Sequence, residues 1–203
     1  DIGNTNIVTG CIKDGKILFR ERLSTRHTAT KLEYAAIFKT AFEMYGIDLG
    51  EIDGAIISSV VPSATSVVKE AIEKLCQISV MVVGPGLKTG ISIVIDNPAQ
   101  LGSDLVVDAV ASVAEYSVPQ IIIDMGTATT VTVIDSKRNC IGGIIMPGMK
   151  ISLDSLTGRT SQLPKISLEA PKKVIASNTI DCMKSGIIYG TAGNIDGIID
   201  RIE

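Results

Sequence analysis

Histidine and cysteine are scarce in this 203-residue chain, and each of these two shortages argues against a class of chemistry. Tryptophan is absent, and the single histidine, His27, argues against Ser-His catalysis and against histidine-based metal sites. The four cysteines are widely scattered and form no Cys-x-x-Cys pair, so neither a zinc site nor a disulfide framework is indicated; they are Cys11, Cys76, Cys140 and Cys182. Unpaired cysteines fit a reducing compartment, and we expect a cytoplasmic protein.

The chain also lacks a block of basic residues. Its net charge is −3, so we expect no nucleic-acid partner and no anionic membrane surface as a partner. No apolar stretch approaches the length of a membrane span, and we expect no signal peptide. Hydrophobic residues make up 45% of the chain but aromatic residues only 3%, which is typical of buried Ile- and Val-rich strands in α/β proteins.

One segment organises the interpretation of the rest, Asp124-Met-Gly-Thr-Ala-Thr-Thr-Val-Thr-Val-Ile-Asp135. An apolar run, residues 121–123, leads into it and an alternating pattern follows, which predicts two strands joined by a tight turn. A turn rich in Gly and Thr offers N–H groups and hydroxyls to an anion, and Asp124 offers a carboxylate to a metal ion. Taken alone, the same pattern is also typical of an ordinary hairpin.

The pattern occurs twice, because the chain begins Asp1-Ile-Gly-Asn-Thr-Asn-Ile-Val-Thr-Gly10. Each copy is followed by a second hairpin and a third strand, at residues 17–23 and 140–146. A repeat at this spacing predicts two similar subdomains, residues 1–116, with a bridging helix from about residue 104, and residues 117–203. Only the second copy is preceded by a strand, so we expect a short strand before Asp1. The repeat would also demand further elements after residue 203, so the second subdomain looks incomplete.

Helical periodicity fills the remaining segments. Thr30-Lys-Leu-Glu33 predicts a capping box at a helix start, and Gly46 is placed to end that helix. In the last helix, residues 179–202, four glycines share a stripe: Gly186, Gly190, Gly193 and Gly197. Each costs about 1 kcal/mol of helix propensity relative to Ala. Close approach of another backbone would explain such a stripe. That backbone could belong to the same fold, which we favour, or to a second subunit across an interface.

Two Asp-Gly-Thr hairpins that face each other across a cleft would surround a triphosphate. Their amides and threonine hydroxyls would hold the phosphates, while the aspartates would orient Mg²⁺ directly or through water. The chain contains neither G-x-x-x-x-G-K-[ST] nor G-x-G-x-x-G, so the other common phosphate-binding loops are excluded.

Six motifs, in this order along the chain, resemble those of the type III pantothenate kinase family: Asp1-Ile-Gly-Asn-Thr-Asn, Gly84-Pro-Gly-Leu-Lys-Thr-Gly90, Gly102-Ser-Asp104, Asp124-Met-Gly-Thr-Ala-Thr-Thr130, Gly142-Gly-Ile-Ile-Met-Pro-Gly148 and Asn178-Thr179. The resemblance implies an α/β fold of duplicated ribonuclease-H-like (actin-like ATPase) subdomains, each a mixed sheet flanked by helices. It implies ATP-dependent phosphorylation of pantothenate to 4'-phosphopantothenate, the first step of coenzyme A biosynthesis. It further implies a homodimer, ATP with Mg²⁺, and K⁺ or NH₄⁺.

The same resemblance implies roles for individual residues. The ATP-phosphate loop comprises Asp1, Ile2, Gly3, Asn4, Thr5, Asn6, Ile7 and Val8, with Asp1 near Mg²⁺ through water. In the second copy, Asp124 binds the monovalent cation and Thr127 contacts ATP phosphate. Asp104 is the proton acceptor, and the pantothenate contacts are Gly102, Ser103, Asp104, Leu105 and Thr179.

For Asp104 there is a second interpretation from the residues themselves. Aspartate is a common helix N-cap, worth about 1 kcal/mol, and a helix is predicted to start near this residue. A carboxyl group with an ordinary pKa near 3.9 is ionised at neutral pH and can also orient an attacking hydroxyl, so the two roles can coexist.

Two positions depart from the family pattern. Leu105 stands where the family has an arginine that holds the pantothenate carboxylate, and Ile95 stands where a tyrosine is common. Leucine cannot replace the charge-assisted, often bidentate contact of an arginine with a carboxylate. The departures leave an alternative open, a nucleotide-binding, kinase-like paralogue with an altered acceptor or a non-catalytic regulatory role.

Overall fold

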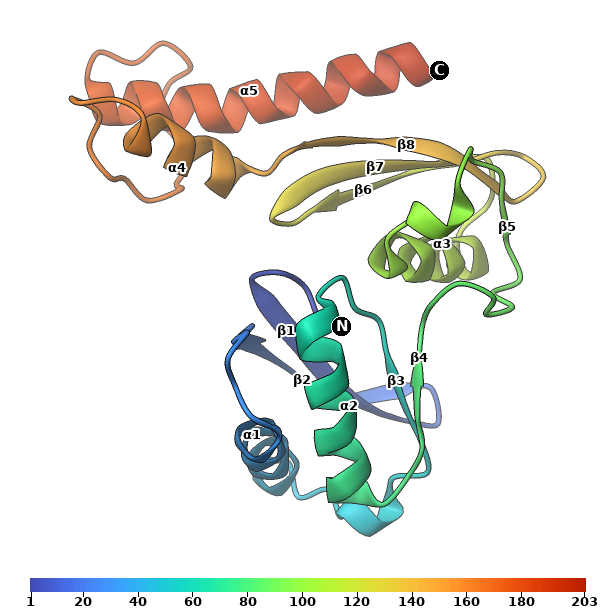
Figure 1. The fold of residues 1–203 in the computed structure, drawn as a ribbon. Coiled ribbons are helices and arrows are strands. Elements are labelled where there is room, and N and C mark those ends of the chain that lie inside the picture. The colour runs from blue at the N-terminus through green and yellow to red at the C-terminus, as the bar shows by residue number, and fades with distance from the viewer. The chain divides into compact units, whose positions relative to one another are not determined.

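The computed structural model describes all of residues 1–203, which form two compact units, Asp1–Tyr116 and Ser117–Glu203. Helices and strands are interspersed along the chain, so the predicted α/β class is confirmed (Figure 1). None of the helices is both long enough and apolar enough to cross a membrane.

The sheet of the first unit is built around a hairpin. Strands β1 (Asn6–Lys13) and β2 (Lys16–Ser24) pair antiparallel, and β3 (Ala55–Ile57) pairs parallel with β4 (Val80–Val82). A single residue lies between these pairs: Ile2 bridges antiparallel to Ile7 and parallel to Ser59. The strand order is therefore β2-β1-Ile2-β3-β4. A further short strand, β5 (Ser92–Ile93), belongs to the same stretch of chain.

Three helices complete the first unit, α1 (Lys31–Met44), α2 (Pro62–Cys76) and α3 (Ser103–Glu115), with short 3₁₀ turns at Leu49–Glu51 and Pro98–Gln100. The predicted capping box is confirmed: Glu33 N donates to Thr30 Oγ1, and Thr30 N donates to the Glu33 carboxylate at 2.7 Å. The bond from the Thr30 backbone lowers the pKa of Glu33. Gly46, at a φ of +64°, follows the end of this helix, as predicted.

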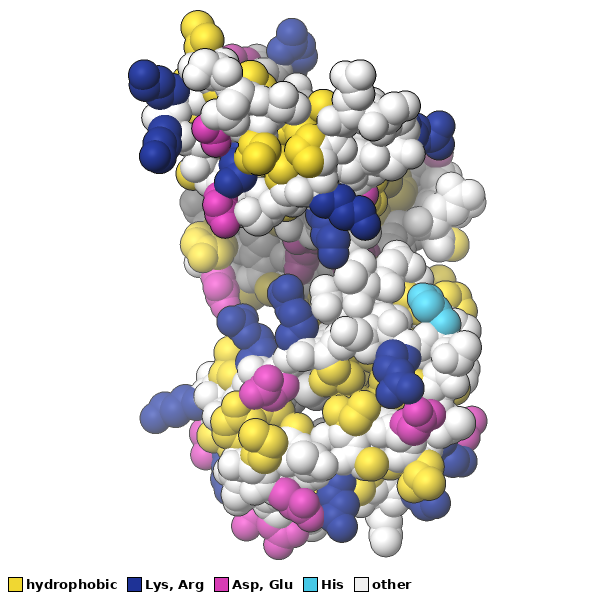
Figure 2. Space-filling view, turned by 90° about the vertical axis from the view of Figure 1, so that its left-hand side faces the viewer, with side chains coloured by type: hydrophobic (Ala, Val, Ile, Leu, Met, Phe, Trp, Pro, Cys, Tyr) yellow, Lys and Arg dark blue, Asp and Glu magenta, His cyan; other side chains and the backbone are white.

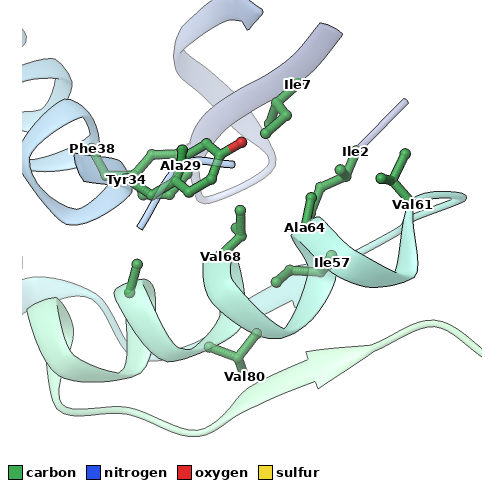
Figure 3. Packing of buried hydrophobic residues seen from close by; sticks show 11 residues of the cluster. Ile2, Ile7, Ala29, Tyr34, Phe38, Ile57, Val61, Ala64, Val68 and Val80 are labelled. Atoms are coloured by element: carbon green, nitrogen blue, oxygen red, sulfur yellow. The ribbon is translucent and has the colours of Figure 1, made fainter. Parts of the chain in front are cut away.

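The core of the first unit lies between α1, α2 and one face of the sheet (Figure 3). The rings of Tyr34 and Phe38 stack with centroids 6.2 Å apart. Val68 of α2 is buried, as are Ile2 and Ile7 beside the first predicted phosphate loop. Full burial of one such aliphatic side chain stabilises the fold by about 1.5–3 kcal/mol. The core therefore anchors both ends of the loop that joins Ile2 to Ile7.

The second unit begins with an antiparallel meander, β6 (Gln120–Met125), β7 (Ala128–Ile134) and β8 (Asn139–Pro147), with β7 in the middle. Two helices follow, α4 (Met149–Gly158) and α5 (Thr179–Ile202), and they pack through Leu153, Met183 and Ile187. The bounds predicted for the last helix are confirmed. In the turn between β7 and β8, bonds from Asn139 to the Asp135 carboxylate lower the pKa of Asp135.

The glycine stripe of α5 contradicts our expectation. A Cβ added at Gly186, Gly190 or Gly193 would meet no atom within 4 Å, and at Gly197 it would meet only Arg201 of the same helix. The prediction of close packing within the fold is therefore wrong. The absence of side chains along this stripe is not explained by any contact within the chain.

Charged side chains are dispersed on the surface. On the face drawn in Figure 2, Lys and Arg side chains are interspersed with Asp, Glu and apolar side chains. The ion pairs are mostly exposed, among them Lys13–Glu51 and Lys31–Glu70, and pairs of this kind contribute little to stability.

Candidate active site

The first predicted phosphate loop is a tight turn held at its base. Asp1 and Val8 form a hydrogen-bonded pair, with N···O distances of 2.8 and 2.9 Å, and Gly3 N donates to Asn6 O at 2.9 Å. Thr25 Oγ1 donates to Gly3 O at 2.6 Å. The side chains of Asn4 and Thr5, at the tip, are exposed. The loop is thus fixed by its backbone while its polar tip is exposed, which suits a phosphate.

The second loop has the same plan with a shorter tip. Gly126 N donates to Ala128 O at 3.0 Å, so Thr127 is the residue at the tip of this turn, where its side chain is exposed. Asp124 lies on the preceding strand, in register with Thr130, and its side chain is exposed. The repeat seen in the sequence is therefore also a repeat of local structure, an acidic residue followed by a glycine-containing hairpin.

Gly148, the N-cap of α4, lies against the second loop. Its N–H donates to Thr127 O at 3.1 Å. A Cβ at this position would lie 2.3 Å from Thr127 O and 2.5 Å from Gly126 O, closer than any carbon can approach a carbonyl oxygen. Only glycine fits there. The position belongs to the motif Gly142–Gly148 of the sequence analysis, but no local sequence pattern predicts its contact with the loop.

We expect Gly148→Ala to displace the Thr127 loop, since the two carbonyl oxygens must move to admit a methyl group. Overpacking of this kind costs about 1–3 kcal/mol of stability. Thermal denaturation should show the loss, and the KM for ATP should rise. The matched control is Gly158→Ala, where an added Cβ meets nothing within 4 Å. Equal melting temperatures for the two variants would contradict the close approach.

Ser103, at the start of α3, forms hydrogen bonds with the segment that follows β3. The sequence analysis gave this serine only as a pantothenate contact. Ser103 Oγ donates to Ser59 O at 2.8 Å and accepts from Ser59 N at 2.9 Å. Ser58 Oγ also donates to it, at 3.3 Å. Because Ser59 is the residue that pairs with Ile2, one short segment holds both the first loop and the helix that carries Asp104.

We expect Ser103→Ala to destabilise the protein by about 1–3 kcal/mol, because Ser103 is buried and its loss leaves the backbone groups of Ser59 without their partner. The change should also lower kcat, since the start of α3 is no longer fixed. Chemical denaturation and steady-state kinetics would test this. Ser66→Ala, at an exposed position of α2, is the comparison. A Ser103→Ala variant as stable as wild type would contradict the role given to this serine.

Asp104 is half-buried in the first turn of α3 but is not its N-cap. The N-cap is Gly102, two residues earlier, and no side chain caps the helix, so the N-cap interpretation of Asp104 is wrong. Its Oδ1 accepts from Leu105 N at 2.8 Å, and a Cβ on Gly102 would lie 2.3 Å from that oxygen. The carboxylate is therefore oriented by its neighbours, and the helix N-terminus favours its negative charge.

The other predicted substrate residues divide between the two units. Leu105 is half-buried next to Asp104, and Ile95 is also half-buried in the first unit. Thr179 is in the second unit, at the exposed start of α5, where it lines a cavity of about 590 Å³ together with Cys182 and Met183. The structure thus brings together the first loop, Ser103 and Asp104 in one unit, and Asp124 with Thr127 in the other.

The acidic residues fit cations that are held partly by a substrate. No group of three or more His, Cys, Asp or Glu side chains is arranged to hold a metal ion. Mg²⁺ needs no such group, because it is usually held by one or two carboxylates, substrate phosphates and water. The exposed Asp1 carboxylate, beside the first loop, has the right chemistry. The exposed Asp124 carboxylate, beside the second, can serve a monovalent cation.

Comparison with known proteins gives one consistent family. The model of the type III pantothenate kinase family matches residues 1–201. A curated relative of that name from Halalkalibacterium halodurans is 41% identical over all 203 residues, which span 80% of the relative. Those from Bacillus cytotoxicus and an Exiguobacterium strain are 40% and 42% identical over the whole chain, which spans 78% and 80% of them.

A solved structure shares the fold. A Baf family transcriptional activator from Campylobacter jejuni superposes with a TM-score of 0.55 at 16% identity, covering 97% of this chain and 76% of that one. At this identity the match supports the fold and no activity.

Proposed function

This chain belongs to the type III pantothenate kinase family, and we propose that the two loops and the start of α3 carry the catalysis of that family. The function is ATP-dependent phosphorylation of pantothenate to 4'-phosphopantothenate, which begins coenzyme A biosynthesis. The non-catalytic alternative is not favoured, because relatives matched at 40–42% identity over the whole chain are named as kinases.

We propose that each unit is a ribonuclease-H-like subdomain of the actin-like ATPase kind. The order β2-β1-Ile2-β3-β4 supports this for the first unit, since it combines an antiparallel hairpin with parallel strands. The meander β6-β7-β8 supports it for the second unit, because it repeats the acidic residue, the glycine turn and the return strand.

In the proposed site, the backbone and side chains of residues 3–6 and the Thr127 hydroxyl bind the phosphates of ATP. Asp1 holds Mg²⁺ through water, and Asp124 holds K⁺ or NH₄⁺. Bound cations supply positive charge that neutralises the transferring phosphoryl group. The contribution of the chain is to orient the phosphates by loops whose glycines, Gly3 and Gly126, are fixed by hydrogen bonds at the base of each turn.

Asp104 is the proposed proton acceptor for the hydroxyl of pantothenate, with Gly102, Ser103, Leu105 and Thr179 as substrate contacts. The observation that carries the proposal is the pair of hydrogen bonds between Ser103 and Ser59. They fix the start of α3 to the segment that pairs with Ile2, and so hold Asp104 and the first loop in one rigid arrangement. Positioning of this kind supplies most of the rate in phosphoryl transfer.

We also propose a cytoplasmic homodimer. All four cysteines are free thiols, which suits a reducing compartment. The glycine stripe of α5 meets no other part of the chain, so this helix face is open to a second copy. The family resemblance supports both statements.

The proposed function is tested by pantothenate-dependent release of ADP from Mg·ATP. We expect turnover on the order of 1–100 s⁻¹ in potassium buffer, the usual range for kinases. Replacing potassium by sodium should slow it, and Asp124→Asn should remove that difference. Release of ADP that does not depend on pantothenate would contradict the assignment of the acceptor.

A further inference from the structure

The hydroxyl of Thr130, on β7, is buried and has no hydrogen-bond partner within the chain. The residue as a whole is only half-buried, so it is the polar atom in particular that is shielded from water. The large majority of buried hydroxyls have a partner, because desolvation without a hydrogen bond is costly. The unsatisfied oxygen therefore points to a ligand that supplies a partner from outside the chain.

Thr130 lies directly opposite Asp124 in the ladder of β6 and β7, and Ile145 of β8 completes the row. Side chains at opposite positions of an antiparallel pair share one face of the sheet, with Cβ atoms about 4.5–5.5 Å apart. The Asp124 carboxylate leans toward the turn, since a Cβ on Gly126 would lie 3.4 Å from Asp124 Oδ2. One carboxylate and one hydroxyl therefore lie side by side at the base of the second loop.

These two groups suit a cation that has lost part of its water. Both are oxygen ligands, and a hydroxyl has two lone pairs that can face a metal ion or accept a hydrogen bond from ammonium. Ile145, on the other side of Thr130, offers no polar atom, so the partner of the hydroxyl must lie on the Asp124 side. Rotation about the Cα–Cβ bond of Thr130 exchanges its hydroxyl and its methyl group, which turns the oxygen without moving the strand.

We propose that the Thr130 hydroxyl is a second ligand of the monovalent cation at Asp124 and determines the preference for K⁺ or NH₄⁺ over Na⁺. The placing of this cation at Asp124 rests on the proposed function. Asp124 supplies the charge, and Thr130 replaces one water molecule of the ion. Because water does not reach the Thr130 oxygen, the ion must be dehydrated on that side, which costs K⁺ and NH₄⁺ less than the smaller Na⁺.

The unpartnered hydroxyl makes the effect of Thr130→Val depend on the ion. In choline buffer, valine keeps the shape of the side chain and removes a buried polar group without a partner, so the melting temperature should rise by about 2–4 °C. Potassium at roughly ten times its dissociation constant should raise the melting temperature of wild type by about 3–6 °C. The same addition should raise that of Thr130→Val by about 1 °C or less.

The experiment measures melting temperatures in choline, sodium, ammonium and potassium buffers. Thr130→Ser keeps the hydroxyl and should keep the gain with potassium. Thr129→Val makes the matched change at the neighbouring position, which faces the other side of the sheet, and should keep it too. In the kinase assay, Thr130→Val should raise the potassium concentration for half-maximal rate about tenfold or more.

A potassium gain in Thr130→Val equal to that of wild type would overturn the proposal, and so would a wild type that melts at one temperature in all four buffers. A lower melting temperature of Thr130→Val in choline would show that the hydroxyl has a partner within the chain, with the same consequence. Asp124→Asn separates the two assignments. Loss of the gain in Asp124→Asn alone would keep the proposed cation site and refute the role of Thr130. Loss in Thr130→Val alone would support Thr130 as a ligand and count against Asp124.

Discussion

Replacing Asp104 with asparagine is expected to lower kcat for pantothenate phosphorylation by about 10²–10⁴-fold, the usual contribution of a positioned general base. Asparagine keeps the size of the side chain and can still accept a bond from Leu105 N, so the fold should persist. What is lost is the charge that we propose accepts the proton of the attacking hydroxyl. The KM for ATP should change little, because the phosphate loops are untouched.

Steady-state kinetics with varied ATP and varied pantothenate would separate these effects. Asp154→Asn, an exposed position on α4, makes the same chemical change elsewhere and should leave kcat unchanged. Melting temperatures of the two variants would show that neither is unfolded. A kcat for Asp104→Asn within about threefold of wild type would exclude Asp104 as the proton acceptor, since such a group contributes at least about a hundredfold.

The second large effect is expected at Leu105. Restoring arginine there should lower the KM for pantothenate by about 10–100-fold, because a hydrogen bond to a charged group is worth about 1.5–3 kcal/mol and 1.4 kcal/mol is a factor of ten. The gain should appear with pantothenate and not with its uncharged amide, since the guanidinium binds the carboxylate. Leu105 is half-buried, so the aliphatic part of arginine can keep part of its packing.

Leu105→Met is the matched control, because it conserves volume and apolar character. It should leave the KM for pantothenate near that of wild type. If arginine changes the KM no more than methionine does, another cation already holds the carboxylate, and the specificity of this enzyme is set elsewhere in the site.

Local patterns predicted much of this fold. The α/β class, the duplicated hairpin, the capping box at Thr30 and the bounds of α5 all follow from periodicity and turn chemistry within short windows. The loop residues Asp1 and Asp124 were predicted from the same kind of pattern, since an acid and a glycine beside a polar turn are adjacent in sequence.

Contacts between distant residues could not be predicted in this way. Ser103 lies 44 positions from Ser59, and neither segment contains a sequence pattern that predicts a hydrogen bond between them. The N-cap of α3 is Gly102, which has no side chain to cap the helix, and the cap assigned to Asp104 was therefore wrong. The glycines of α5 led to a wrong prediction because a stripe of glycines indicates close packing but does not show which segment packs there.

The most direct test of the account is detection of the product. Wild-type protein, Mg·ATP, potassium and pantothenate should yield 4'-phosphopantothenate and ADP in equal amounts by mass spectrometry, while Asp104→Asn yields at most about a hundredth as much in the same time. Formation of ADP without phosphopantothenate, or equal product from both proteins, would contradict the assignment of this site to pantothenate phosphorylation.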